Sequence, residues 1–143
     1  MGKGLDGSAR GDAVADGGMI VDSAMDFRQA VFGTSAPREI LEGLCLLDVR
    51  YTEFDGRTHA GQIVIHLELA AEIGEIFALM EALKFPVAGA VPIVRYDWSD
   101  NASMAADNSS AFNYRTIAGT DRLSLHALGR AVDINPRENP AVY

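Results

Sequence analysis

Three shortages in the sequence each exclude a class of protein. Cysteine occurs once, as Cys45, so the chain cannot form an internal disulfide. Lysine and arginine number 12 against 20 aspartates and glutamates, which gives a net charge of −8, and no basic cluster occurs. Because proteins bind phosphates through clustered positive charge, we expect no nucleic-acid partner. No apolar run approaches the roughly 20 residues of a transmembrane helix, so we expect no membrane span.

Two further features concern Cys45 and the N-terminus. Cys45 lies in the apolar run 44–47, which predicts a buried thiol with a structural role. A secretory signal begins with basic residues followed by an apolar stretch, and no signal peptide of that layout is visible here. A leader can be removed or lie on a missing segment, so this feature leaves the compartment open.

The composition otherwise fits one small domain. The chain has 143 residues, of which 48% are hydrophobic, enough for a core. Residues 1–20 are rich in glycine and cannot bury enough apolar surface to offset the entropy of ordering. We therefore predict a flexible Gly-rich N-terminal segment over 1–20 and a single domain over 21–143.

Sequence periodicity over residues 21–143 predicts an α+β fold, a small antiparallel sheet with packed helices. The β-favouring residues Val49, Tyr51 and Phe54 in the run 46–54, and the run 62–66, predict two strands joined by a hairpin turn at Asp55-Gly56. We also predict two further strands, over 91–96 and 130–134. Helices are predicted over 23–32, 69–83 and 102–107, and another helix is predicted to begin at about residue 37.

The helix over 69–83 has one apolar stripe, because its apolar residues recur at steps of three and four. The stripe consists of Leu69, Ile73, Ile76, Met80 and Leu83. The glutamates between residues 68 and 81 lie off it and are expected to face solvent.

Residues 124–133 read S-L-H-A-L-G-R-A-V-D and carry the strongest chemical signal. His126 and Asp133 lie seven residues apart, with Gly129 between them. An imidazole nitrogen and a carboxylate oxygen are both good ligands for Zn²⁺. Glycine permits the positive φ of a sharp turn, so the turn can direct both side chains to one point.

The pattern S-x-H-x-x-G-x-A-x-D resembles the zinc-binding signature of the D-alanyl-D-alanine carboxypeptidase family, which includes peptidoglycan endopeptidases. Further segments also look like that family, and the likeness covers roughly residues 40–143. These segments are 51–61, 103–115, 133–136 and 139–140.

The resemblance implies a zinc metallopeptidase that cleaves peptides of bacterial peptidoglycan. In that family, the positions of His126 and Asp133 supply two of three protein ligands to zinc. Zinc lowers the pKa of its bound water to ~7 and polarises the peptide carbonyl. The resemblance also implies the cell envelope or a secreted location, and peptidoglycan peptides as the partner.

The resemblance leaves the third ligand unassigned. Family members provide a late histidine shortly after an acidic general base, and both are expected beyond Tyr143, so the chain looks truncated relative to the family. No catalytic residue is identified within it. His59 and His66 are alternative ligands, although a surface hairpin side chain is expected for His59 and a solvated or partly packed one for His66.

Two further residues are candidates for substrate binding. Arg115 presents the planar guanidinium that pairs with a carboxylate, and stem peptides carry free carboxylates; the alternative is a salt bridge to a local acid. Ser124 resembles a family position near the substrate or the metal loop; the alternative is turn capping. Residues 107–110 form either a cleft wall or a polar turn network, and we favour the turn.

Two functions are therefore open. The first is a zinc-dependent peptidase, either D-Ala-D-Ala carboxypeptidase-like or L,D-endopeptidase-like. The second is a catalytically inactive family fold that binds peptidoglycan fragments or a protein partner. The bond that is cleaved and the oligomeric state do not follow from the sequence.

Overall fold

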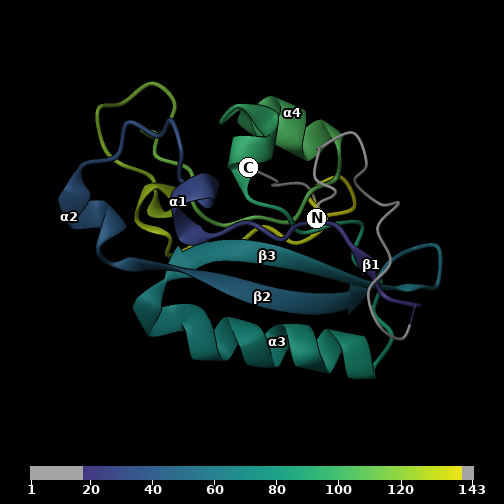
Figure 1. Cartoon of the computed structure of the whole chain (residues 1–143). Coiled ribbons are helices and arrows are strands. Elements are labelled where there is room, and N and C mark those ends of the chain that lie inside the picture. Colours follow the sequence, from purple (N-terminus) through teal and green to yellow (C-terminus); the bar gives the residue numbers. More distant parts are fainter. Residues whose placement is uncertain (1–17, 140–143) are drawn as a thin grey trace.

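The fold is a three-stranded sheet with helices on both faces, seen in a computed structural model that describes residues 18–139 (Figure 1). Strands β2 (Leu44–Thr52) and β3 (Thr58–His66) form a long antiparallel hairpin, as predicted. The short strand β1 (Ile20–Val21) pairs in parallel with the other edge of β3, so the sheet is mixed and has the order β1-β3-β2. The α+β class is confirmed.

Helix α3 (Ala70–Ala82) covers one face of the sheet (Figure 1). The opposite face lies under α1 (Phe27–Ala30) and α4 (Asp100–Ala105) and the long connections around them. Helix α2 (Arg38–Leu41) precedes β2, and short 3-10 helices occur at η3 (Leu67–Leu69), η4 (Ile93–Tyr96) and η5 (Leu125–Leu128). No helix in the described range 18–139 is long and apolar enough to cross a membrane.

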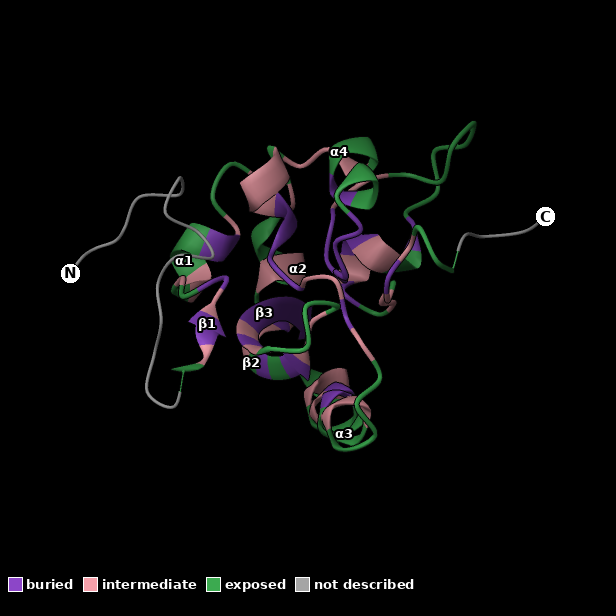
Figure 2. Ribbon diagram, turned by 90° about the vertical axis from the view of Figure 1, so that its right-hand side faces the viewer, coloured by how far each residue is buried: buried purple, intermediate pink, exposed green. Residues whose placement is uncertain are grey.

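Strand β3 is the centre of the core and is buried on both faces (Figure 2). Successive side chains of a strand point to opposite faces. Ile63 and Ile65 accordingly pack with Phe77 of α3 in one cluster, whereas Val64 packs with Ala30 of α1 in a second cluster. This explains why the sequence of β3 is continuously apolar near its end rather than alternating.

The structure corrects the predicted apolar stripe of α3. Ile73 and Phe77 are the buried residues of this helix, while Ile76 is 46% exposed and Leu83 is 71% exposed. Ile76 and Phe77 lie three and four residues after Ile73, so helical spacing allows either one to share its face. The larger aromatic side chain is the one that faces the sheet. The predicted stripe was therefore wrong at Ile76 and Leu83, whereas Leu69, Ile73 and Met80 do pack against the core.

Two predicted strands are absent from the described residues. Residues 93–96 form the 3-10 helix η4, because Pro92 lacks an N–H and the chain then turns through positive φ at Asp97 and Trp98. Residues 130–134 form no strand, and only Asp133 makes an isolated bridge, to Ser110. Side-chain hydrogen bonds, described below, hold that segment instead.

Smaller predictions have mixed outcomes. Ser99 caps α4 by accepting a hydrogen bond from the N–H of Ala102, as predicted. Cys45 is half-buried rather than buried, and desolvation raises the pKa of its thiol. The predicted flexible segment 1–20 lies outside the described residues up to residue 17, but Ile20 already belongs to β1 and is buried.

Candidate functional site

The candidate site is built around η5, which holds His126. Ser124 begins this turn, and its hydroxyl accepts a hydrogen bond from the N–H of Ala127 at 3.2 Å. Gly129 ends the turn in the left-handed conformation, with φ 69° and ψ 23°. The predicted positive φ at this glycine is confirmed. Of the two roles open to Ser124, the structure contains the turn capping.

Gly129 is required for space as well as for conformation. A Cβ atom at this position would lie 2.5 Å from Cδ2 of Leu44 and 2.9 Å from the backbone N of His66. The N–H of His66 also donates to the carbonyl of Gly129 at 2.9 Å. The turn that carries His126 is thereby fastened directly to the end of β3.

The imidazole of His126 is oriented by the backbone of a neighbouring segment. Its Nδ1 lies 2.7 Å from the carbonyl oxygen of Ala111. A carbonyl can only accept, so Nδ1 carries the hydrogen, and in the neutral ring Nε2 presents a lone pair. The side chain is 17% exposed, so the ring is largely enclosed. A backbone carbonyl behind the ring is the usual arrangement for metal-binding histidines.

Asp133 faces the free nitrogen of this ring. Its Oδ2 lies 3.4 Å from Nε2 of His126, and its side chain is 51% exposed. The isolated bridge with Ser110 places Asp133 beside the segment that also carries Ala111. The structure thus brings together the two side chains that the sequence singled out.

The separation of these two atoms suits a shared ion better than a direct hydrogen bond. Charge-assisted N–H···O bonds measure about 2.7–2.9 Å, which is shorter than the 3.4 Å here. Two ligands bound tetrahedrally at about 2.0–2.2 Å from zinc lie about 3.3–3.5 Å apart. The residues therefore fit the group that the family resemblance implies.

No third ligand joins this pair within residues 18–139. The one group of three metal-binding side chains there consists of Glu53, Asp55 and His59 and includes neither His126 nor Asp133. His66 lies elsewhere, where it caps η3 by accepting from the N–H of Glu68 and lies 3.2 Å from Nη2 of Arg130. The late acid and histidine expected beyond Tyr143 fall outside the described residues.

His59 is buried, so the predicted surface hairpin position was wrong. Only 7% of the residue is exposed, and its ring stacks on that of Tyr51. Nδ1 lies 2.8 Å from Oδ2 of Asp22, and Nε2 lies 3.1 Å from Oδ2 of Asp55. Desolvation lowers the pKa of His59, but the hydrogen bonds and charges of the two aspartates outweigh it and raise the pKa overall. The sequence contained no signal for Asp22 as a partner, because it lies 37 residues away.

Arg115 forms an ion pair through its Nε with Asp100. The other carboxylate oxygen of Asp100 accepts a hydrogen bond from the side-chain amide of Asn113 at 2.8 Å. The local salt bridge is thus present, and the side chain of Arg115 is still 38% exposed. The N–H of Ser124 donates to the carbonyl of Arg115, which places the backbone of this arginine beside the start of η5.

The polar segment 107–110 is buried and structural, as favoured from the sequence. Asn108 bonds to both backbone groups of Val91 at 2.9 Å, and the hydroxyl of Ser109 accepts from the N–H of Asn135 at 2.9 Å. The carboxylate of Asp107 accepts from the N–H of Arg137. These bonds attach the segment behind His126 to the segment that bears Asp133.

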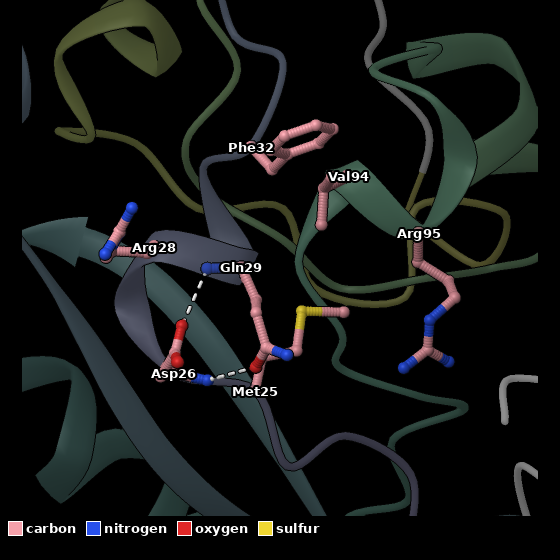
Figure 3. A pocket seen from close by; sticks show the side chains of 7 residues that line it. All are labelled: Met25, Asp26, Arg28, Gln29, Phe32, Val94 and Arg95. Atoms are coloured by element: carbon pink, nitrogen blue, oxygen red, sulfur yellow. Dashed lines mark hydrogen bonds between the residues drawn. The ribbon is translucent and has the colours of Figure 1, made fainter. Parts of the chain in front are cut away.

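A separate hollow of about 730 Å³ lies between α1 and η4 (Figure 3). Met25, Phe32 and Val94 form its apolar walls. Gln29 also lines the hollow. Its side-chain amide oxygen accepts a hydrogen bond from the N–H of Asp26, as part of the capping box of α1. Neither His126 nor Asp133 lines this hollow, so it is not part of the candidate site.

Comparison with known proteins adds no assignment. No protein-family model matches the chain, and no significant match to it was found among curated proteins or solved structures.

Proposed function

We propose that this protein is a zinc-dependent peptidase that hydrolyses stem peptides of bacterial peptidoglycan. The family resemblance of residues 124–133 suggests the reaction, and one observation carries the proposal. That observation is the 3.4 Å separation between Nε2 of His126 and Oδ2 of Asp133, combined with the Ala111 carbonyl behind the ring. Between the two residues the chain passes through the left-handed conformation of Gly129, which ends the turn that carries His126.

His126 and Asp133 would hold the metal. The hydrogen bond to Ala111 keeps Nδ1 protonated, so Nε2 is the atom that would bind the metal. The ring is already oriented, so metal binding requires little reorganisation of this side chain. The exposed carboxylate of Asp133 leaves the site open to solvent on that side. When bound, zinc supplies an activated water for attack on the peptide carbonyl and stabilises the charge that develops on its oxygen.

Arg115 and Ser124 are the proposed substrate-binding residues. Asp100 forms an ion pair with Arg115 through Nε, while the side chain of Arg115 stays 38% exposed. A guanidinium so placed can pair with a terminal carboxylate of a stem peptide. Ser124 contributes by capping the turn that carries His126, and its N–H bonds to the carbonyl of Arg115.

A second candidate function is a binding module without catalysis. The observation that favours it is the lack of a third metal-binding side chain beside His126 and Asp133 within residues 18–139. The chain has only three histidines, and His59 and His66 are engaged elsewhere. Two protein ligands bind zinc more weakly than three and leave the water without a general base.

Metal analysis tests the ligand assignment. Zinc content and affinity should fall strongly in His126→Ala and in Asp133→Ala. Asp121→Ala, an exposed acid in the preceding loop, is the matched control and should bind as the parent does. Unchanged zinc binding in both site variants would refute the assignment.

Incubation with muropeptides separates the two functions. Turnover that a chelator abolishes and zinc restores supports the peptidase. Saturable binding without turnover, weakened in Arg115→Gln, supports the binding module. If the protein neither cleaves nor binds muropeptides, both functions are wrong.

A further inference from the structure

We propose that Glu53, Asp55 and His59 form a second site for a divalent transition-metal cation, at the tip of the β2–β3 hairpin. Each residue offers one ligand atom, and the three atoms lie within 4.8 Å of one another. The set includes an imidazole that is nine-tenths buried, with 10% of its side chain exposed, so it is not a purely acidic surface cluster. This inference does not depend on the proposed peptidase function.

The imidazole of His59 is held in place from behind. Its Nδ1 lies 2.8 Å from Oδ2 of Asp22, and the hydroxyl of Tyr51 donates to that same carboxylate oxygen at 2.6 Å. Stacking on the ring of Tyr51, at 5.9 Å between centroids and 18° between planes, restricts rotation. A carboxylate on one ring nitrogen fixes the other as the ligand atom, which is the arrangement that orients metal-binding histidines. The remaining nitrogen, Nε2, points toward the hairpin tip.

The two carboxylates are also fixed, by backbone N–H groups of the turn. Glu53 accepts from the N–H of Asp55 at 3.0 Å, and Oδ1 of Asp55 accepts from the N–H of Arg57 at 2.7 Å. These bonds leave Oδ2 of Asp55 at 3.1 Å and Oε1 of Glu53 at 4.0 Å from Nε2 of His59. The side chains of Asp55 and Glu53 are 38% and 22% exposed, so a cation can reach the cluster from solvent.

The charge around this imidazole is unbalanced. Within the described part of the chain, neither Glu53 nor Asp55 forms an ion pair with a lysine or arginine. A proton on His59 supplies one positive charge against the two carboxylates at the tip. A divalent cation offsets this excess more fully, and the effect is strongest where the nitrogen is shielded from water.

The donor set selects the kind of cation. Calcium takes oxygen ligands, and magnesium is usually held by carboxylates and water. One imidazole with two carboxylates suits borderline ions such as Mn²⁺, Fe²⁺ and Zn²⁺. Three protein ligands at the solvent side leave positions for water.

This site is separate from the one at His126. The segment behind His126 lies along β3 at Val64, whose carbonyl accepts from the N–H of Phe112. Val64 is five residues from His59, which is roughly 16 Å at about 3.3 Å per strand residue. One ion cannot contact both sites.

Titration with Mn²⁺, followed by electron paramagnetic resonance, tests the proposal. We expect one site that weakens at least about tenfold in Asp55→Asn and in Glu53→Gln. Both substitutions keep an oxygen that accepts the turn hydrogen bonds, so the hairpin should stay folded. Asp121→Asn, which alters no residue of either proposed metal site, should leave this affinity unchanged.

Localisation by NMR makes the test independent of affinity. Substoichiometric Mn²⁺ should broaden the amide signals of residues 53–59 first. Equal binding by the parent and Asp55→Asn, or broadening centred on residues 124–133 alone, would overturn the proposal. No binding by the parent at millimolar Mn²⁺ would also overturn the proposal. That result would mean that a proton on His59, and not a metal ion, offsets the negative charge of Glu53 and Asp55.

Discussion

Substitution of Gly129 by alanine should destabilise the protein far more than the same change at another glycine with a similar backbone. Two costs add at Gly129. Its φ of 69° is unfavourable for alanine by roughly 1–2 kcal/mol. A new Cβ atom would also meet Leu44 at 2.5 Å and the backbone of His66 at 2.9 Å, and forced overpacking costs roughly 1–3 kcal/mol. The sum is about 2–5 kcal/mol.

Gly119 provides the matched control. Its φ is 80°, but a Cβ atom there would meet nothing within 4 Å. Only the conformational cost of roughly 1–2 kcal/mol remains. For a domain of this size, each kcal/mol lowers Tm by roughly 3–4 °C, so we expect a fall of about 6–20 °C for Gly129→Ala and about 3–8 °C for Gly119→Ala.

Calorimetry of the two variants beside the parent measures both values, and zinc titration of the same samples reports on the site. The zinc affinity of Gly129→Ala should fall with its stability, because the turn carries His126. Equal falls in Tm for the two variants would show that the close contacts at Gly129 relax without cost. That result would refute the idea that this glycine fixes the turn against β3.

Three further predictions concern the core, a cap and pH. Phe77→Ala should cost about 3–5 kcal/mol in chemical denaturation, whereas Ile76→Ala should cost under about 1 kcal/mol; similar losses would restore the stripe predicted from sequence. Ser99→Ala should remove about 1 kcal/mol by deleting the cap of α4, and Ser99→Asp should recover it. The raised pKa of His59 means that the folded state holds the proton more tightly. When a chelator removes metal ions, the stability that protonated His59 adds to the folded state is fully present below the unfolded pKa of about 6.5. It is lost as the pH rises through the higher pKa of the folded state. The Tm of the parent should therefore fall over that range, and a flat profile, or the same fall in His59→Gln, would contradict the assignment.

The sequence predicts the elements whose signals are local. The hairpin depends on the Asp55-Gly56 turn and on β-favouring side chains before it, and both are visible in sequence. The cap at Ser99 and the turn at Gly129 are likewise properties of a few adjacent residues. For the same reason, α3 was found with Ile73 on its buried face, although Phe77 was missed.

The errors arise where distant residues decide the structure. A short apolar run such as 91–96 fits a strand or a tight turn, and the environment of Pro92 determines which one forms. Strand β1 has two residues, too few for a periodic signal, and exists because β3 offers it an edge. Burial of His59 depends on Asp22, which is distant in sequence, and on Tyr51, which belongs to the neighbouring strand β2.

For the candidate site, the sequence predicted the pair of metal ligands but not the groups that orient them. His126 and Asp133 were identified from spacing and family likeness. The carbonyl of Ala111 orients the ring, and a backbone oxygen leaves no trace in residue type. Asp100 as the partner of Arg115 could be guessed only as one of several local acids.

The segment that bears Asp133 belongs to no strand or helix, and the side chain of buried Asn135 is one of the groups that attach it. This amide accepts from the N–H of Ala88 at 2.9 Å and donates to the carbonyl of Pro86 at 2.8 Å. Because these bonds lie outside the β2–β3 ladder, residues 130–139 can detach while the sheet stays intact, at a smaller free energy than global unfolding. Amide protons there should exchange sooner than those of β3. Any ion held between residues 126 and 133 would then escape at the rate of this partial opening, long before the domain melts.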